Sequence, residues 1–145
     1  MKKLIIIGAA AIALTSPTIA AAQTATFTTT GGTATVVGTT TYGANMQVGT
    51  SRVTHSNGTT TNESWTCISM SQPENAKIFD IHVVCDMTST AGNYISNWGC
   101  NFVGEQGAVG CVGGLTGRTG AYAGKSGAAT FAGTGGTGTG TMQWR

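Results

Sequence analysis

Threonine and glycine dominate this chain from Gln23 onwards, and this composition strongly limits the folds that are open to it. The segment Gln23–Arg145 contains 25 Thr and 22 Gly. Thr is β-branched and favours strands, while Gly permits turns, bulges and close approach of backbones. No segment shows the apolar periodicity of an amphipathic helix of useful length. The composition therefore predicts one all-β domain of short strands joined by tight turns.

The clearest expected strand is Lys77–Cys85, because its apolar residues alternate with polar ones. Phe79, Ile81 and Val83 would then face the core together with Cys85. A hairpin turn is expected at Asn57-Gly58, and loops are expected over Asp86–Gly92 and over the glycine-dense segment Gly113–Gly120. Further strands are expected at Thr24–Tyr42 (broken at Gly31-Gly32 and Gly38), Thr59–Met70, Asn93–Phe102, Ala108–Val112, Gly127–Ala132 and Thr137–Trp144.

Eight to ten strands at this spacing fit either a closed barrel or a β-sandwich. The last expected strand favours a barrel, because Gly138, Gly140, Met142 and Trp144 share one of its faces. Glycines on a packed face leave space for large side chains from neighbouring strands, as a small barrel requires.

The first 22 residues have the layout of a cleaved secretory signal. Met1-Lys2-Lys3 is basic, Leu4–Leu14 is apolar, and Ala20-Ala21-Ala22 offers small residues before Gln23. The compact basic start is typical of a bacterial signal, and the apolar run is short for a retained membrane anchor, which is the alternative. We therefore expect a signal peptide at residues 1–22 and a single β-domain at residues 23–145, in the periplasm or secreted.

The charges that remain after Gln23 exclude two classes of partner. Five basic residues and five acidic residues balance each other when His is neutral. No basic patch indicates nucleic acid, and none indicates an anionic membrane surface. An outer-membrane barrel is also disfavoured, because the expected Thr/Gly strands are too polar and too interrupted for an apolar outward band.

Four cysteines remain in the exported segment: Cys67, Cys85, Cys100 and Cys111. An even number in an exported chain predicts two disulfides, and the absence of a C-x-x-C pair disfavours a zinc site. The spacing alone leaves three possible connectivities.

The glycine-rich segment Gly113–Gly127 resembles a loop of the allene oxide cyclase-like and dirigent-like barrels. In that family a G-G-T-G-x-Y-x-G-x-x-G pattern precedes a Gly/Thr-rich terminal strand, whereas this chain carries an additional Arg118-Thr119 before Gly120. Cys85-Asp86 with Gly92-Asn93 is similar to a segment of small exported bacterial members, with Asn93 in place of the usual second acid.

This resemblance covers roughly Trp65 to Trp144 and implies an eight-stranded antiparallel barrel with one open end. It also implies that Cys67 pairs with Cys85 and that Cys100 pairs with Cys111 across the turn at Glu105–Gly107. The alternative fold is an immunoglobulin-like sandwich. No catalytic motif of the family aligns residue for residue, so the resemblance transfers no catalytic residue.

Asp80 and His82 form the best polar pair in the sequence. At positions i and i+2 of a strand they point the same way, so an interior pair would serve as a proton shuttle or orient a ligand. The alternative is a solvated outer face opposite Phe79 and Ile81. Together with the aromatic residues Trp98 and Tyr122, Asp80 and His82 are the expected ligand contacts.

Other polar residues have structural explanations that we prefer. Asp86 with Asn93 supplies too few oxygens for a cation site, so turn capping is the expected role. Arg118 and Lys125 flank the glycine-rich loop without the spacing of a phosphate loop. The threonine runs are too irregularly spaced for an ice-binding surface, and strand propensity explains them.

Three functional hypotheses follow, and none calls for a cofactor or a metal. The first is a non-enzymatic module of the cell envelope, or a secreted one, that binds a small apolar molecule or simply serves as a stable domain. The second is a cyclase or isomerase that confines a small apolar substrate. The third is a surface-structural subunit. The absence of a catalytic constellation favours the first, and the sequence leaves the oligomeric state open.

Overall fold

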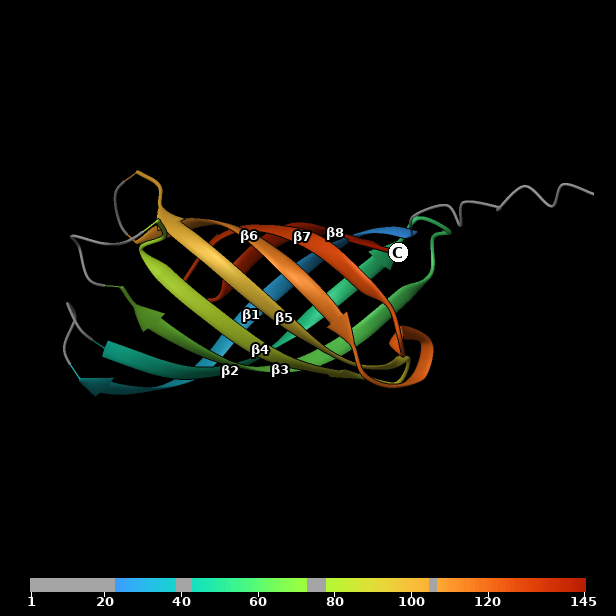
Figure 1. The fold of residues 1–145 in the computed structure, drawn as a ribbon, viewed down its shortest axis with the longest axis horizontal. Helices are drawn as coiled ribbons and strands as arrows, with labels where there is room; N and C mark the ends of the chain where they lie inside the picture. The colour runs from blue at the N-terminus through green and yellow to red at the C-terminus, as the bar shows by residue number, and fades with distance from the viewer. Residues whose placement is uncertain (1–22, 39–42, 73–77, 105–106) are drawn as a thin grey trace, which may run out of the picture.

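The computed structural model describes residues 23–38, 43–72, 78–104 and 107–145, and the expected signal at residues 1–22 lies outside them. Eight antiparallel strands form a closed barrel in which each strand pairs with the next and β8 pairs with β1 (Figure 1). The prediction of an all-β, eight-stranded antiparallel barrel is thus confirmed, and the sandwich is excluded. The strands are β1 (Gln23–Gly38), β2 (Gly43–His55), β3 (Thr60–Ser71), β4 (Ile81–Ser89), β5 (Gly92–Phe102), β6 (Ala108–Gly117), β7 (Ser126–Thr134) and β8 (Thr137–Trp144).

Alternation of buried and exposed residues along most of the strand length separates a packed interior from a solvated exterior. In β8, Met142 and Trp144 are buried while Thr139 and Thr141 are exposed. Threonines of neighbouring strands lie side by side on the outer surface, where the Oγ1 atoms of Thr130 and Thr141 are 2.8 Å apart. The threonines therefore favour the strand conformation and present a polar surface to the solvent.

Interior glycines accommodate the aromatic rings of the core. Gly140 lies against the ring of Phe27, and a Cβ atom at Gly113 would overlap the ring of Trp98. Each pair joins directly opposed residues of neighbouring strands. This arrangement confirms the expected role of glycines on the packed face of β8.

Two disulfides link adjacent strands on the inner face of the barrel. Cys67 of β3 bonds to Cys85 of β4, and Cys100 of β5 bonds to Cys111 of β6. Both pairs are directly opposed in register, with Cα–Cα distances of 4.0 and 4.1 Å. The expected pairing is confirmed, and the two bonds indicate an oxidising environment.

The barrel end that contains both termini of the domain is closed by the segment between β6 and β7. This segment contains a 3₁₀ turn, η1 (Gly120–Tyr122), and directs the side chain of Tyr122 into the core. Gly92 and Gly120 pack closely against each other's segments in positive-φ conformations, which a side chain would disrupt. Among the described residues, no helix has the length and apolar character needed to cross a membrane.

Several predicted boundaries are wrong, although the Asn57-Gly58 turn and the last strand are confirmed. The strand expected from Lys77 begins only at Ile81, and Phe79 packs outside the barrel against Gly99 and His82. Asp86–Ser89 continue β4 instead of forming a loop.

Two further predictions, which took glycine pairs as loops or strand breaks, are also wrong. Gly113 and Gly114 lie within β6, and Gly31-Gly32 produces a register shift in β1 instead of a break. The turns expected at Gln72–Asn75 and Glu105–Gly107 lie mainly outside the described residues, which exclude 73–77 and 105–106.

Candidate ligand-binding site inside the barrel

The barrel interior contains a cavity of about 240 Å³ whose walls are mainly apolar. Phe27 and Phe131 stack with a centroid distance of 6.3 Å and form part of one wall. Phe102 also lines the cavity and is 55% exposed, so the cavity reaches solvent at the end opposite η1. Other apolar lining residues are Trp65, Val83, Met87, Trp98, Leu115, Met142 and both disulfides.

A buried carboxyl group lies among the lining residues. Glu63 of β3 is only 3% exposed and accepts hydrogen bonds from the hydroxyl groups of Tyr94 (2.7 Å) and Tyr122 (3.3 Å). The rings of Tyr94, Tyr122 and Trp144 contact one another at centroid distances of 4.9 to 5.1 Å. They fill the closed end of the barrel behind Glu63.

Burial changes the acid–base properties of this cluster. Desolvation raises the pKa of Glu63 above its usual value, and the hydrogen bonds from the two tyrosines oppose that effect only in part. Burial and the negative charge of Glu63 also raise the pKa of Tyr94. The same two causes raise the pKa of Tyr122 to about 12. Both tyrosines therefore stay protonated at neutral pH and donate to the carboxyl group.

Two further polar atoms next to Glu63 lack hydrogen-bond partners among the described residues. They are Ser51 Oγ and Trp65 Nε1, whose residues are 3% and 5% exposed. Ser51 lies directly opposite Glu63 in the β2–β3 register, and Trp65 follows Glu63 on the same inner face of β3. All three residues line the cavity.

Glu63 is a site residue that the sequence does not single out. Its neighbours Asn62 and Ser64 are polar, and the segment Asn62–Ser64 matches a glycosylation sequon, a pattern that is typical of a solvated loop. The signal that could have found it is strand parity, because Glu63 is two residues before the inward-facing Trp65.

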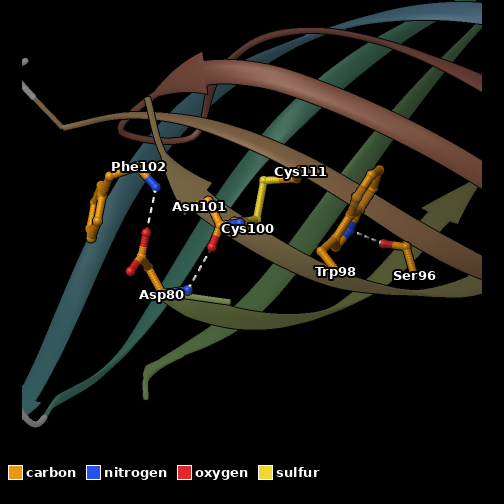
Figure 2. Close-up of a disulfide and its surroundings, with 7 residues drawn as sticks. All are labelled: Asp80, Ser96, Trp98, Cys100, Asn101, Phe102 and Cys111. Atoms are coloured by element: carbon orange, nitrogen blue, oxygen red, sulfur yellow. Dashed lines mark hydrogen bonds between the residues drawn. A yellow bond between two sulfur atoms is a disulfide. The ribbon is translucent and has the colours of Figure 1, made fainter. Parts of the chain in front are cut away.

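The four expected ligand contacts are separated in the structure. Trp98 lines the cavity, and its Nε1 donates to Ser96 Oγ at 2.9 Å (Figure 2). Tyr122 lies at the closed end, where it bonds to Glu63. Asp80 and His82 lie outside the barrel, so we leave them out of the candidate site.

Asp80 instead joins the start of β4 to the end of β5. Its carboxylate accepts a hydrogen bond from the backbone N–H of Phe102 at 2.8 Å, and its own N–H donates to Asn101 Oδ1 at 3.0 Å (Figure 2). His82 is exposed on the outer face of β4. The two residues do not face a common enclosed space, as a proton shuttle inside the barrel would require.

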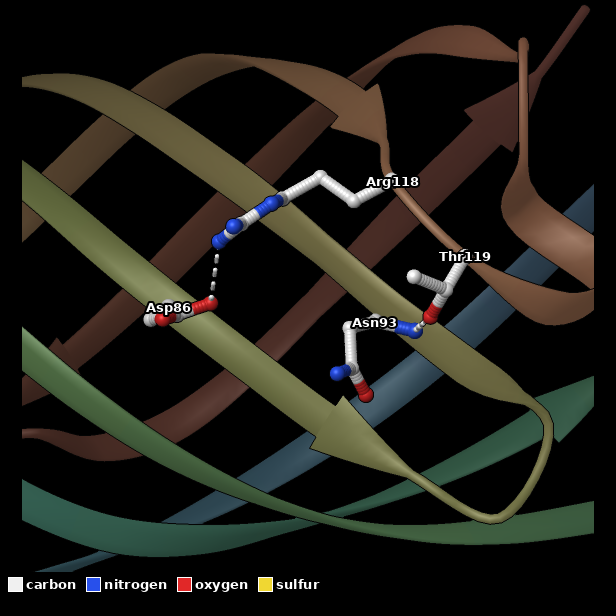
Figure 3. Close-up of polar contacts among 4 residues, drawn as sticks. All are labelled: Asp86, Asn93, Arg118 and Thr119. Atoms are coloured by element: carbon white, nitrogen blue, oxygen red, sulfur yellow. Dashed lines mark hydrogen bonds and ion pairs between the residues drawn. The ribbon is translucent and has the colours of Figure 1, made fainter.

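The expected turn capping by Asp86 and Asn93 is wrong, because Asp86 lies within β4 and Asn93 within β5, and each contacts the segment that follows β6. Asp86 lies 3.5 Å from the guanidinium of Arg118, and both side chains are more than half exposed (Figure 3). The backbone N–H of Asn93 donates to Thr119 Oγ1 at 3.0 Å. Within the described ranges, no three His, Cys, Asp or Glu residues are grouped as a metal site requires.

Comparisons with known proteins add no relative to this description. A scan against protein-family models found no match, and searches of curated proteins and of solved structures found no significant similarity. The resemblance of Gly113–Gly127 to allene oxide cyclase-like barrels therefore stays a prediction.

Proposed function

We propose that the protein is an exported binding module that holds a small, mainly apolar molecule inside its barrel. The observation that carries this proposal is the mainly apolar cavity, whose lining extends to the exposed Phe102 at the end opposite η1. Ligand sites are typically concave and apolar, with a few polar groups that orient the ligand. The inner Glu63 cluster supplies such groups.

The cavity volume limits the size of the ligand. An apolar cavity of about 150 Å³ binds benzene, and typical ligand pockets measure about 300–1,000 Å³. At about 240 Å³, this cavity suits a molecule larger than one aromatic ring and smaller than most drugs.

Export to the periplasm or beyond is part of the proposal. The basic, apolar and small-residue order of residues 1–22 predicts a signal peptide, and the two disulfides require an oxidising environment to form. An enzymatic role as a cyclase or isomerase stays a prediction that depends on the family resemblance.

The adjacent residues Val83 and Val84 provide a matched test of ligand binding. Val83 lines the cavity, whereas Val84 is 49% exposed on the outer face of the same strand. Naphthalene is expected to bind the wild-type protein in a saturable one-to-one manner by calorimetry. Val83→Phe should weaken this binding by roughly tenfold or more, because the extra ring occupies the cavity, and Val84→Phe should leave it unchanged.

Circular dichroism would first establish that both variants keep the β-fold. If naphthalene does not bind the wild-type protein, or if both variants bind it equally, the cavity is not a ligand site.

A second candidate function, self-assembly as a surface-structural subunit, has one observation in its favour. β8 pairs with β1 only as far as Thr29, so residues 34–38 of β1 pair with β2 alone among the described residues. Val36 and Val37 are each 68% exposed on this free edge. An uncharged edge strand is a template for antiparallel pairing with a second copy of the chain.

Sedimentation velocity over a wide concentration range tests this candidate. If edge pairing drives association, Val37→Lys should abolish it and the control Val112→Lys should leave it intact. Val112 is a suitable control because it is 56% exposed on β6, which has partner strands on both sides. A monomer at the highest concentration would contradict it.

A further inference from the structure

Three residues with polar side-chain groups occupy neighbouring inward positions of β2 and β3. Ser51 and Glu63 are directly opposed, and Trp65 lies diagonally from Ser51. Opposed residues place their Cβ atoms about 5 Å apart on a common face, so the three side chains are neighbours. All of them line the cavity and are at least nine-tenths buried.

Their hydrogen-bonding capacity is only partly used by the protein. Glu63 receives two tyrosine hydroxyl groups, whereas a carboxylate offers about four lone-pair sites. The indole N–H of Trp65 and the hydroxyl of Ser51 have no partner within the described part of the chain. Buried polar groups without partners are costly, so a group that bonds to both is strongly favoured there.

The donor and acceptor properties of these three side chains restrict which polar group of a ligand could bind to them. Trp65 Nε1 is a donor only, Ser51 Oγ both donates and accepts, and Glu63 offers acceptor oxygens. A carbonyl or ether oxygen accepts from Trp65 but offers nothing to Glu63. An ammonium donates to Glu63 but cannot accept from Trp65. A carboxylate would place a second negative charge beside a buried acid, which is unfavourable.

A hydroxyl group can bond to all three residues, because its O–H donates to Glu63 while its two lone pairs accept from Trp65 and from Ser51. We propose that the ligand is an uncharged alcohol or phenol with an apolar body, whose hydroxyl binds between Ser51, Glu63 and Trp65. Its apolar body extends along Phe27, Trp98 and Phe131 towards the open end. This inference rests on the proposed function of the cavity.

A pair of isosteric ligands separates this inference from the proposed function. 1-Naphthalenemethanol and 1-ethylnaphthalene differ in a hydroxyl that replaces a methyl group. The alcohol is expected to bind at least about tenfold more tightly by calorimetry, because its hydroxyl gains buried hydrogen bonds to Glu63, Trp65 and Ser51. Equal or tighter binding of 1-ethylnaphthalene would overturn the hydroxyl proposal and leave the cavity as a ligand site. If neither ligand binds, both proposals are wrong.

Conservative variants locate the hydroxyl. Trp65→Phe and Ser51→Ala each remove one polar atom and keep most of the shape. Each should lower the preference for the alcohol over the hydrocarbon by about three- to tenfold. Ser64→Ala is the matched control for Ser51→Ala, because Ser64 is exposed on the outer face of β3 between Glu63 and Trp65 and the preference should not change.

A spectroscopic measurement on the wild-type protein is independent of variant folding. The Trp65 indole N–H resonance should shift on addition of 1-naphthalenemethanol by more than on addition of 1-ethylnaphthalene. Equal shifts, or a preference for the alcohol that survives both Trp65→Phe and Ser51→Ala, would place the hydroxyl elsewhere and contradict the inference.

Discussion

At the scale of single residues, Glu63 is the unusual feature of this barrel. A carboxyl group in an apolar interior either loses its charge or needs hydrogen bonds to the charged form. The structure supplies both influences, since burial raises the pKa of Glu63 while Tyr94 and Tyr122 donate to it. The residue is therefore a source of polarity inside the cavity that destabilises the fold when it ionises.

The raised pKa of Glu63 predicts a pH dependence of stability. Because this pKa is higher in the folded protein, the folded state binds the proton of Glu63 more tightly than the unfolded chain does. The resulting stabilisation is fully present below the unfolded pKa, about 4.5, and is lost as the pH rises through the higher folded value.

Urea unfolding of the wild-type protein and of Glu63→Gln at a series of pH values checks this prediction. The difference between the two proteins cancels the contributions of the other carboxyl groups, which both proteins share. The wild-type protein should lose stability relative to Glu63→Gln as the pH rises above about 4.5. A relative gain over that range would show that the hydrogen bonds from the tyrosines outweigh burial.

At the scale of strands, inward-facing glycines leave room for aromatic rings that belong to neighbouring strands. Gly113 and Gly114 are adjacent in β6 but face opposite sides. A Cβ atom at Gly113 would overlap the ring of Trp98 and the carbonyl of Asn97, whereas one at Gly114 would meet nothing within 4 Å. The inner glycine is thus required by packing and the outer one is not.

These two glycines give a matched prediction. Gly113→Ala should destabilise the protein by about 1–3 kcal/mol, because the added methyl displaces Trp98 or the backbone. Gly114→Ala should be neutral or stabilising by up to about 1 kcal/mol, since alanine reduces the entropy of the unfolded chain. Thermal unfolding of both variants measures the difference, and equal melting temperatures would contradict the packing argument.

The same residues explain why some strands were predictable and others were not. Alternation in Thr137–Trp144 involves large side chains on one face and threonines on the other, so the sequence alone located β8. Gly113-Gly114 looked like a loop, because glycine in isolation indicates flexibility and only the ring of Trp98 on β5 explains its presence in a strand. Phe79 gave the opposite error: its apolar side chain predicted an inward position in a strand, but its ring covers Gly99 on the outside of the barrel.

At the scale of the whole molecule, closure of the barrel joins the two ends of the domain. β1 pairs with β8, so residues about 115 positions apart are hydrogen-bonded neighbours. The disulfides do not make this closure, because each links strands that are adjacent in sequence. They instead staple two hairpins that together form one wall.

Reduction should therefore destabilise the barrel without changing its topology. The bridges close loops with sequence separations of 18 and 11 residues, and a bridge of this size contributes roughly 3 kcal/mol. Urea unfolding of a Cys100→Ser/Cys111→Ser double variant should reveal a loss of about that size. A loss well below about 1 kcal/mol would mean that the strand pairing alone holds this hairpin.

The sequence by itself determined the fold class of this protein. Threonine and glycine dictate short strands and tight turns, because one is stiff and β-branched and the other fits close contacts. The resemblance of its glycine-rich segment also predicted the barrel and the pairing of Cys67 with Cys85 and of Cys100 with Cys111, as the structure confirms.

Only the tertiary structure decided what lies inside the barrel. Whether Glu63 or His82 faces the cavity depends on the parity of each strand after closure, and a one-residue change of register exchanges the two faces. The hydrogen bonds that Glu63 accepts inside the barrel come from Tyr94 and Tyr122, which are 31 and 59 residues away in the sequence. The site is therefore a property of strands that meet in space, because no local pattern records which distant side chains an inward residue will contact.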